Sequence, residues 1–490
     1  MRIFRGRKQK TSGRRTAYTW SFVVFCLGVL MTVVIIASVG TRLSPSSHAA
    51  TLTGDLNGDG TVNVFDLSIF LAHWQQTGSG IAEDFNNDGS VNIFDLSILL
   101  TNYGASGGGT NVALFNRITY AGSLPGASSS YLNQEANRYQ VIQLQGDEGA
   151  SLVSTLHADN PNLKVFVYVD DIGTKSGDPQ AITSCTNYST DNTNANAHPG
   201  NPQYDWFLKD SGGNRIQYSG YPGQYLMDVA NPYYQAACIA HAMDLVRNMG
   251  ADGVAWDNVI ANLSWVESAS VPEYPTQSSW VAAEYNWATA VGPIAHSNGL
   301  LQLPNVSGGR WDSNFPTFRQ DIITKGEMDG TMEQSWTDGG LGTAQQDPYW
   351  AGKLADASWA ETNHKYYVAN NAEATDSESE DRYGLASLLM VANGYASYST
   401  SWNSCFTTCE SSWPEYSTAQ QLGSPTGAYS HRTNGAYERD FANGVVLVNP
   451  SQNTIASFSP TPGGTYSGSG LTNVSSVTLG PDQGLILLKN

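Results

Sequence analysis

Apolar positions change their spacing along the 490-residue chain, and each spacing predicts a different kind of element. From residue 111 to about residue 430, short continuous apolar runs alternate with amphipathic stretches. Such runs are typical of parallel strands buried on both faces. Eight strand–helix units predict a (β/α)8 TIM barrel, which we assign to residues 111–430. The predicted strands are Val112–Phe115, Val141–Leu144, Lys164–Val169, Tyr225–Val229, Gly253–Trp256, Leu300–Leu303, Gly330–Met332 and Tyr366–Ala369.

One helix and one insertion stand out within the barrel region. Asn231-Pro232 predicts the start of a helix that runs to Met249, with Asn as N-cap and Pro in the first turn. Residues 174–224 are rich in Asn, Gly and Pro, which predicts a long insertion between a strand and this helix.

The pattern changes again after the barrel region. Asn443–Val448, Thr454–Phe458 and Gly484–Leu488 are short apolar runs separated by Gly and Pro, with no helical spacing between them. This pattern predicts a small C-terminal antiparallel β domain at residues 431–490.

The first 50 residues combine basic side chains with an apolar run, Trp20–Val39. The run is long enough to span a bilayer, and the cations before it favour a cytoplasmic N-terminus. A cleaved secretory signal is the alternative, with small residues for cleavage at Ser47–Ala50. Both interpretations place the rest of the chain outside the cell. An uncleaved segment would anchor it to the cell surface through the membrane, and a cleaved segment would leave it secreted.

A repeat follows this segment. Asp55–Asp66 recurs as Asp84–Asp95, 29 residues later, and a helical apolar pattern follows each copy. The repeat predicts an EF-hand-like helical calcium module at residues 51–104, followed by a Gly-rich linker at residues 105–110.

Each copy carries side-chain oxygens at the ligand positions of a calcium loop, and a glycine, Gly60 or Gly89, at the sixth position. Hard oxygen donors at these spacings favour Ca²⁺ over softer metals, so we expect two Ca²⁺ ions. The expected ligands are Asp55, Asn57, Asp59, Thr61, Asn63 and Asp66 in the first loop, and Asp84, Asn86, Asp88, Ser90, Asn92 and Asp95 in the second.

The paired loops resemble the dockerin modules that dock secreted enzymes onto cohesin partners. The resemblance implies calcium binding and a cohesin-type protein partner. It departs from the family at loop positions 10 and 11, where dockerins often carry small polar residues for cohesin contact. Here these positions hold Val64-Phe65 and Ile93-Phe94.

Charge and cysteine content narrow the function further. The first 50 residues hold eight of the 24 basic residues and none of the 43 acidic ones, so the remainder is strongly acidic. Nucleic-acid binding is excluded as a function class, because it needs clustered cations. Cys26 lies in the apolar run, and the four cysteines that follow it predict two disulfides in an exported chain, with a zinc site as the alternative. Pairing the neighbours Cys405 and Cys409 leaves Cys185 with Cys238.

Polar residues follow many of the predicted strands, at the barrel end that carries the chemistry of such enzymes. Asp257 and Glu333 each end a strand beside a tryptophan, and glycoside hydrolysis needs two carboxyl groups across one bond. We therefore predict Asp257 as nucleophile or base and Glu333 as general acid. The predicted substrate-binding residues are Asp228, which could instead cap the helix at Asn231, and Asp170, Asn305, Trp256 and Trp336.

Tyr225–Pro232 and Gly250–Val259 resemble glycoside hydrolases related to endo-α-1,4-polygalactosaminidase, and the similarity extends over residues 111–450. The resemblance implies a (β/α)8 barrel and hydrolysis of O-glycosyl bonds of a polysaccharide, without naming the sugar. The alternative function is a non-catalytic carbohydrate-binding or adhesive surface protein that keeps the barrel as a scaffold.

Overall fold

The computed structural model describes residues 54, 56, 62, 64–78, 81–86, 88–101, 103, 114–118, 124, 127–178, 180–265, 270–307, 315–337, 349–371, 378–400 and 414–490. The N-terminal apolar run, the linker 105–110 and the pair Cys405 and Cys409 lie outside these residues. Within them, no helix is both long and apolar enough to cross a membrane.

The repeat forms two matching helices, α2 (Val64–Ala72) and α3 (Ile93–Thr101). Their core consists of equivalent residues of the two copies: Val62 and Val91 before the helices, and Phe70 and Leu99 within them. The paired helical module that the repeat predicts is confirmed.

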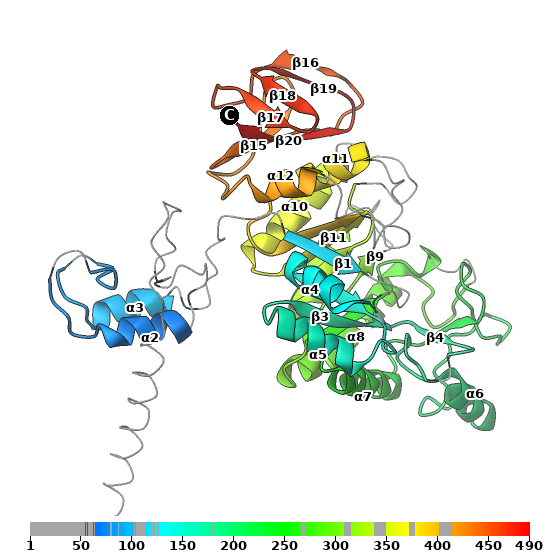
Figure 1. Cartoon of the computed structure of the whole chain (residues 1–490). Helices are drawn as coiled ribbons and strands as arrows, with labels where there is room; N and C mark the ends of the chain where they lie inside the picture. Colours follow the sequence, from blue (N-terminus) through cyan, green and yellow to red (C-terminus); the bar gives the residue numbers. More distant parts are fainter. Residues whose placement is uncertain are drawn as a thin grey trace, which may run out of the picture. The chain divides into compact units, whose positions relative to one another are not determined.

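The central part is an eight-stranded parallel sheet (Figure 1). Its strand order is β10-β11-β12-β1-β2-β3-β6-β8, and a parallel bridge between Asn305 and Met332 links the two end strands into a nearly closed barrel. The predicted (β/α)8 barrel is confirmed. The strands are β1 (Leu114–Ile118), β2 (Val141–Leu144), β3 (Lys164–Asp170), β6 (Gly253–Asp257), β8 (Leu301–Gln302), β10 (Gly330–Glu333), β11 (Tyr366–Asn371) and β12 (Ala396–Thr400).

One predicted strand is wrong. Tyr225–Val229 does not belong to the barrel: β5 (Gln224–Leu226) pairs antiparallel with β4 (Gly173–Lys175) inside the insertion. The run is apolar because Leu226, Met227 and Val229 are buried against the main core. The eighth barrel strand is β12, which pairs with β1 and β11.

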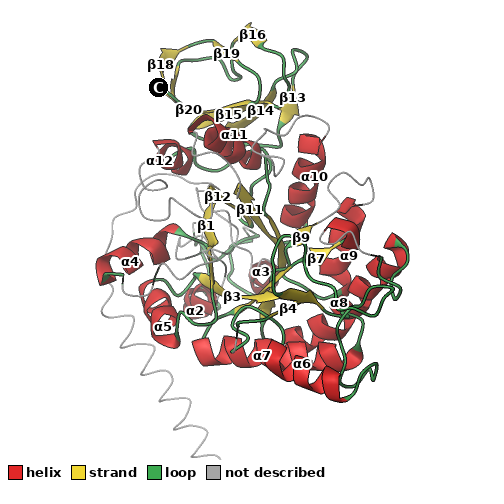
Figure 2. Ribbon diagram, turned by 90° about the vertical axis from the view of Figure 1, so that its right-hand side faces the viewer, coloured by secondary structure: helices red, strands yellow, loops and turns green. Residues whose placement is uncertain are grey.

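A helix follows each barrel strand, and these helices lie outside the strands (Figure 2). The predicted helix from Asn231 to Met249 is α7, and the Asn231 side chain accepts hydrogen bonds from the N–H groups of Tyr233 and Tyr234. The helices are α4 (Ser129–Arg138), α5 (Ala150–Asp159), α7 (Pro232–Met249), α8 (Gln277–Ser297), α9 (Phe315–Lys325), α10 (Tyr349–Thr362), α11 (Glu378–Leu389) and α12 (Pro414–Gln420); α6 (Tyr188–Ala197) lies in the insertion.

The C-terminal strands form an antiparallel sheet of order β13-β14-β15-β20-β17-β18, with β16 and β19 paired beside it. The sheet lies over α11 (Figure 1), so closely that a Cβ added to Gly484 would lie 2.6 Å from the Cβ of Ala386. The predicted antiparallel β region is confirmed. Its strands are β13 (Ser430–His431), β14 (Tyr437–Phe441), β15 (Gly444–Asn449), β16 (Ile455–Phe458), β17 (Tyr466–Gly468), β18 (Leu471–Val474), β19 (Val477–Leu479) and β20 (Gln483–Lys489).

Candidate functional site

The inner face of the barrel has an apolar cluster of its own, which includes Ala255 of β6 and Met332 of β10. Side chains alternate along a strand, so residues two apart share a face. Asp257, two residues after Ala255, therefore points into the barrel. Glu333 directly follows Met332 and points outward, toward the helices. The two predicted catalytic residues thus lie on different faces of the sheet.

The inward carboxylate has a second carboxylate beside it. Asp170 ends β3 and Asp257 ends β6, and the two residues are register partners on these neighbouring parallel strands. Register partners point to the same side of a sheet, so both carboxyl groups point inward at the C-terminal end of the barrel. This end carries the active sites of (β/α)8 enzymes.

Asp257 is held by donors on three sides. The amide of Asn305 donates to its Oδ1 at 2.7 Å, the hydroxyl of Tyr168 donates to its Oδ2 at 2.8 Å, and the N–H of Asn258 donates to Oδ1 at 2.9 Å. Burial raises the pKa of Asp257, and these hydrogen bonds oppose the rise. Asn258 adopts a left-handed φ of 65°, a conformation that asparagine tolerates, and this turns the chain directly after Asp257.

Asp170 is only 3% exposed, and a side chain of the insertion hydrogen-bonds with it. The amide of Gln224 donates to its Oδ2, and the N–H of Ile172 donates to Oδ1 at 3.2 Å. Burial, followed by the negative charge of Asp257, raises the pKa of Asp170 to about 7. Asp170 can therefore keep a proton near neutral pH while its neighbour is ionised.

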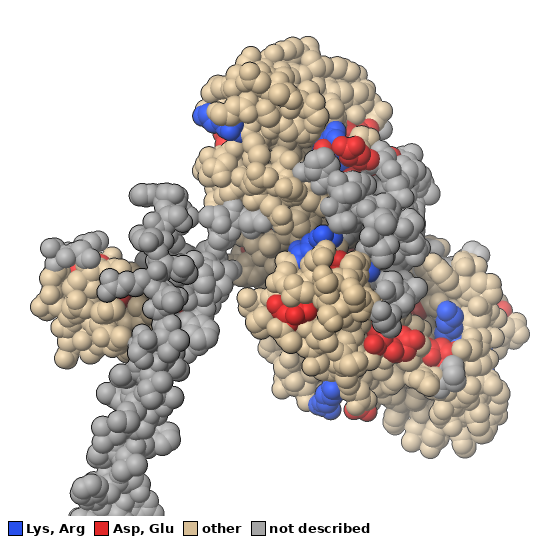
Figure 3. Space-filling model, in the orientation of Figure 1, with Lys and Arg blue, Asp and Glu red and all other residues tan. Residues whose placement is uncertain are grey.

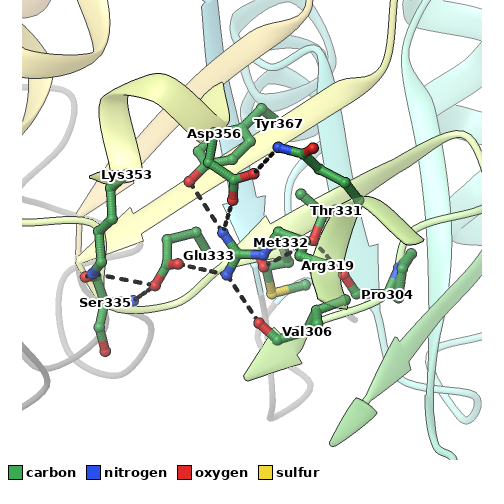
Figure 4. A network of polar contacts seen from close by, with 11 residues as sticks. Pro304, Val306, Arg319, Thr331, Met332, Glu333, Ser335, Lys353, Asp356 and Tyr367 are labelled. Atoms are coloured by element: carbon green, nitrogen blue, oxygen red, sulfur yellow. Dashed lines mark hydrogen bonds and ion pairs between the residues drawn. The ribbon is translucent and has the colours of Figure 1, made fainter. Parts of the chain in front are cut away.

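Glu333 lies in a network of cations in the helix layer (Figure 4). Its carboxylate pairs with Arg319 of α9 at 2.6 Å and with Lys353 of α10 at 3.4 Å, and it accepts the N–H of Ser335 at 3.1 Å. Burial alone would raise its pKa, but the charges of Lys353 and Arg319 lower it to about 2. A general acid must be protonated, so this environment contradicts the acid role predicted for Glu333.

The two tryptophans predicted to bind substrate, Trp256 and Trp336, are packing residues. Trp256 is fully buried, with its ring edge against Trp287 at 5.3 Å between centroids. Trp336 is 1% exposed and donates from its indole nitrogen to the carbonyl of Gly384 at 2.9 Å. Neither ring has an exposed face on which a sugar could bind, which contradicts the substrate-binding role predicted for both.

The remaining predicted residues have distinct surroundings. Asp228 accepts a hydrogen bond from the hydroxyl of Tyr274 and another from the N–H of Ala230, while Asn231 alone caps α7. Burial raises the pKa of Asp228. Tyr168 and Gln224 were not predicted as site residues. Tyr168 lies two residues before Asp170 on the same strand, and this spacing places both side chains on one face.

The disulfide predicted between Cys185 and Cys238 is present, with Cα atoms 4.4 Å apart. It ties the insertion to α7. The segment that carries Cys185 also flanks Asp170: the N–H of Asp170 donates to the carbonyl of Thr183 at 3.0 Å, and the N–H of Cys185 donates to the carbonyl of Asp170 at 3.2 Å. The bridge therefore lies next to the backbone of the inner carboxyl pair.

The second calcium loop has the form that the ion needs. Oxygen atoms of Asp84, Asp88 and Asp95 all lie within 4.8 Å of one another, and Gly89 adopts a φ of 85° at the sharp turn. Three converging carboxylates and neighbouring amide oxygens fit a hard cation such as Ca²⁺. In the first loop, Asp66 is described and is fully buried, whereas Asp55, Asn57, Asp59, Thr61 and Asn63 lie outside the described residues.

Two protein-family models match the sequence. The Hypothetical glycosyl hydrolase family 15 matches residues 157–445, which is more than half of the chain. The Dockerin type I domain matches residues 53–103, and domains of this type bind calcium and cohesins. None of the curated proteins matches the chain.

Solved structures with a similar arrangement are remote. The glycoside hydrolase domain of PelA from Pseudomonas aeruginosa is 14% identical over 59% of this chain and 94% of that chain, with a TM-score of 0.38. The maltogenic α-amylase AmyB from Thermotoga neapolitana is 12% identical over 77% and 98%, with a TM-score of 0.43. Ega3 from Aspergillus fumigatus, solved with galactosamine, is 11% identical over 60% and 91%, with a TM-score of 0.36. The family match, rather than these structures, carries the functional argument.

Proposed function

Because this chain belongs to the hypothetical glycosyl hydrolase family 15, we propose that it hydrolyses O-glycosidic bonds of a polysaccharide with Asp170 and Asp257 as its working carboxyl groups. The observation that supports this pair is their register across β3 and β6, at the C-terminal end of the barrel. The proposal keeps Asp257 in its predicted role and moves the acid role from Glu333 to Asp170.

The two groups have complementary environments. Asp170, with a pKa raised to about 7, would donate its proton to the glycosidic oxygen as the bond breaks. Asp257, held by Asn305 and Tyr168, would attack the anomeric carbon and form a glycosyl ester. Water, activated by the now ionised Asp170, would then release the sugar. Asp228 would bind a substrate hydroxyl, as predicted.

The spacing of neighbouring strands favours retention of anomeric configuration. Paired residues of adjacent strands are about 4.8 Å apart. Retaining enzymes hold their carboxyl groups about 5–5.5 Å apart, whereas inverting enzymes leave about 6.5–9.5 Å for a water molecule. Proton NMR of the first sugar released distinguishes the two outcomes.

The deciding experiment is a screen of the purified chain against polysaccharides, read as new reducing ends, with three variants. We expect Asp257→Asn and Asp170→Asn to abolish turnover while the fold is kept. Glu333→Gln should leave measurable turnover, because its partners lie in the helix layer. Activity in both aspartate variants together with loss in Glu333→Gln would return the acid role to Glu333. Sugar binding without any cleavage by the wild type would favour the non-catalytic alternative.

The N-terminal module extends the proposal. We propose that both loops hold Ca²⁺, that the module binds a cohesin-type partner, and that the enzyme works outside the cell, secreted or anchored by its N-terminal segment. Ile93 and Phe94, at the positions where dockerins often carry small polar residues, are 60% and 66% exposed. A cohesin that binds here would therefore need an apolar surface opposite them.

A further inference from the structure

The insertion between β3 and α7 is built as a folded arm rather than a loose loop. Besides the β4–β5 pair, it contains antiparallel bridges between Lys209 and Arg215 and between Gln217 and Tyr225. Its chain is fixed to the barrel by the Cys185–Cys238 disulfide.

The arm reaches the inner carboxyl pair through two residues. Gln224 donates its side-chain amide to Asp170, and its backbone carbonyl accepts the N–H of Tyr218 at 2.8 Å. Within the described part of the chain, the Tyr218 hydroxyl has no hydrogen-bond partner. Burial, followed by the negative charges of Asp257 and Asp170, raises the pKa of Tyr218. The hydroxyl therefore stays protonated, as a donor within the electrostatic influence of both carboxyl groups.

Tyr218 also lines an open hollow of about 340 Å³. This volume lies at the lower end of the range of about 300–1,000 Å³ found for small-molecule sites. The lining includes Gln217 and two charged residues, Asp210 and Arg215. An aromatic ring beside polar groups is the kind of surface on which a sugar ring stacks with its apolar face.

The charged groups of the lining are already engaged within the chain. Arg215 donates to Asn192 and Asn196 and lies 4.0 Å above the ring of Phe207. The carboxylate of Asp210 accepts the N–H groups of Gly212 and Asn214 and the side-chain amide of Asn214. The lining therefore holds one cation and one anion, both already hydrogen-bonded within the chain, and carries no net charge. On the face of the molecule drawn in Figure 3, charged side chains are few among the described residues.

We propose that this hollow is a binding subsite for an uncharged glycosyl unit next to the bond that is cleaved, with Tyr218 as the residue that contacts the sugar. The inference rests on the proposed glycosidase function and names the substrate class of the same site. The arm would thus supply one wall of the substrate cleft, and Gln224 would link that wall to Asp170.

The test measures binding separately from cleavage. The full chain with Asp257→Asn, which cannot turn over under the proposed mechanism, is run in affinity electrophoresis with soluble polysaccharides. The neutral ones are dextran, galactan, mannan, xyloglucan and starch, and the charged ones are polygalacturonate and chitosan. We expect at least one neutral polysaccharide to retard the protein. Adding Tyr218→Ala should weaken this binding about tenfold, and Tyr218→Phe should weaken it less, since the ring remains. Tyr221→Ala is the matched control: this tyrosine is 57% exposed, contacts Tyr218 edge-on, and should leave binding unchanged.

The possible outcomes distinguish the proposed subsite at Tyr218 from the proposed glycosidase activity. Tyr218-dependent binding by a wild type that cleaves none of these glycans would support the subsite and overturn the hydrolase. Cleavage by the wild type with unchanged binding and KM in Tyr218→Ala and Tyr218→Phe would overturn the subsite alone. Binding only to polygalacturonate or to chitosan, or to no glycan at all, would overturn the assignment to an uncharged sugar. Thermal melts show whether each variant is folded. If Tyr218→Ala is misfolded, the binding measured with Tyr218→Phe decides whether Tyr218 contacts the sugar.

Discussion

Asp170 of β3 lies beside Asp257 of β6 as its register partner, and an amide from the insertion, that of Gln224, donates to Asp170 alone. Two carboxylates in this relation repel each other when both are ionised, so the pair holds one proton over a wide pH range. The donors around Asp257 favour its ionised form, which leaves the proton on Asp170.

This arrangement predicts the pH dependence of activity. We expect kcat to fall as the pH rises through about 7, because Asp170 then loses the proton that the leaving group needs. Asp170→Asn should lower kcat by about 100-fold or more on glycans, less on aryl glycosides with good leaving groups, and should remove the alkaline limb of the profile. Profiles recorded from about pH 5 to pH 9 check this. Asp244→Asn, at an exposed position of α7, is the control, and an identical alkaline limb in Asp170→Asn would contradict the assignment.

The same group should make the fold less stable at high pH. Its pKa is raised from 3.8 to about 7 on folding, so between these values the native state binds more protons than the unfolded state. The contribution of Asp170 to the free energy of unfolding is fully present below the unfolded pKa and is lost as the pH rises through about 7. The loss amounts to at most about 4 kcal/mol. Asp170→Asn should therefore raise the urea midpoint at pH values above 7, relative to wild type, and have less effect near pH 4. An equal effect at both pH values would show that burial does not shift this carboxyl group.

Arg319 provides a prediction about the network around Glu333. It is buried and pairs with both Glu333 and Asp356, at 2.6 Å and 2.5 Å. Arg319→Met leaves Asp356 buried without its cation and leaves Glu333 with Lys353 alone, which should cost about 3–5 kcal/mol of unfolding free energy. Arg247→Met removes an exposed arginine 3.9 Å from Asp244 and should cost less than about 1 kcal/mol. Denaturant unfolding measures both, and similar small losses would mean that the Glu333 network does not stabilise the barrel.

The sequence predicts the barrel well where strands are buried on both faces. The run Val165–Val169 is continuous and apolar because helices cover one side of the strand and the inner cluster fills the other. Strand β12 was missed because its inward positions carry Ser397 and Ser399, which hydrogen-bond with Asn116 in place of apolar packing. The domain limits 51–104, 111–430 and 431–490 stay predictions.

The candidate site was harder to predict. When a strand is apolar on both faces, its sequence does not show which side chains point into the barrel and which point toward the helices. Asp257 and Glu333 end their strands in similar sequence contexts, yet one lies an even step and the other an odd step from the inner cluster. Only the assignment of Ala255 and Met332 to the inner face separates the two carboxylates. The contact of Gln224 with Asp170 spans 54 positions and has no local signal.

Calcium should hold the N-terminal module together. The carboxylates of Asp84, Asp88 and Asp95 converge, so without a cation they repel one another. We expect calorimetry to show two Ca²⁺ per chain, and chelation to abolish the unfolding transition of the module while the barrel transition is kept. Asp88→Ala should remove one ion, whereas Asp244→Ala on α7 should remove none. A full complement of two ions in Asp88→Ala would exclude the second loop as a site.

The disulfide should matter for chemistry as well as for stability, because its segment hydrogen-bonds with the backbone of Asp170 on both sides. The double change Cys185→Ser with Cys238→Ser opens a link across 53 positions and should cost about 2–5 kcal/mol of unfolding free energy. It should also lower kcat and shift the alkaline limb, since Asp170 loses the support that holds it beside Asp257. Reductant during urea unfolding should lower the wild-type midpoint toward that of the variant and leave the variant unchanged. Any effect of reductant on Cys405 and Cys409 would also appear in the variant, so the comparison isolates the Cys185–Cys238 disulfide. A variant with the kcat and the urea midpoint of the wild type would show that the insertion keeps its position without this disulfide.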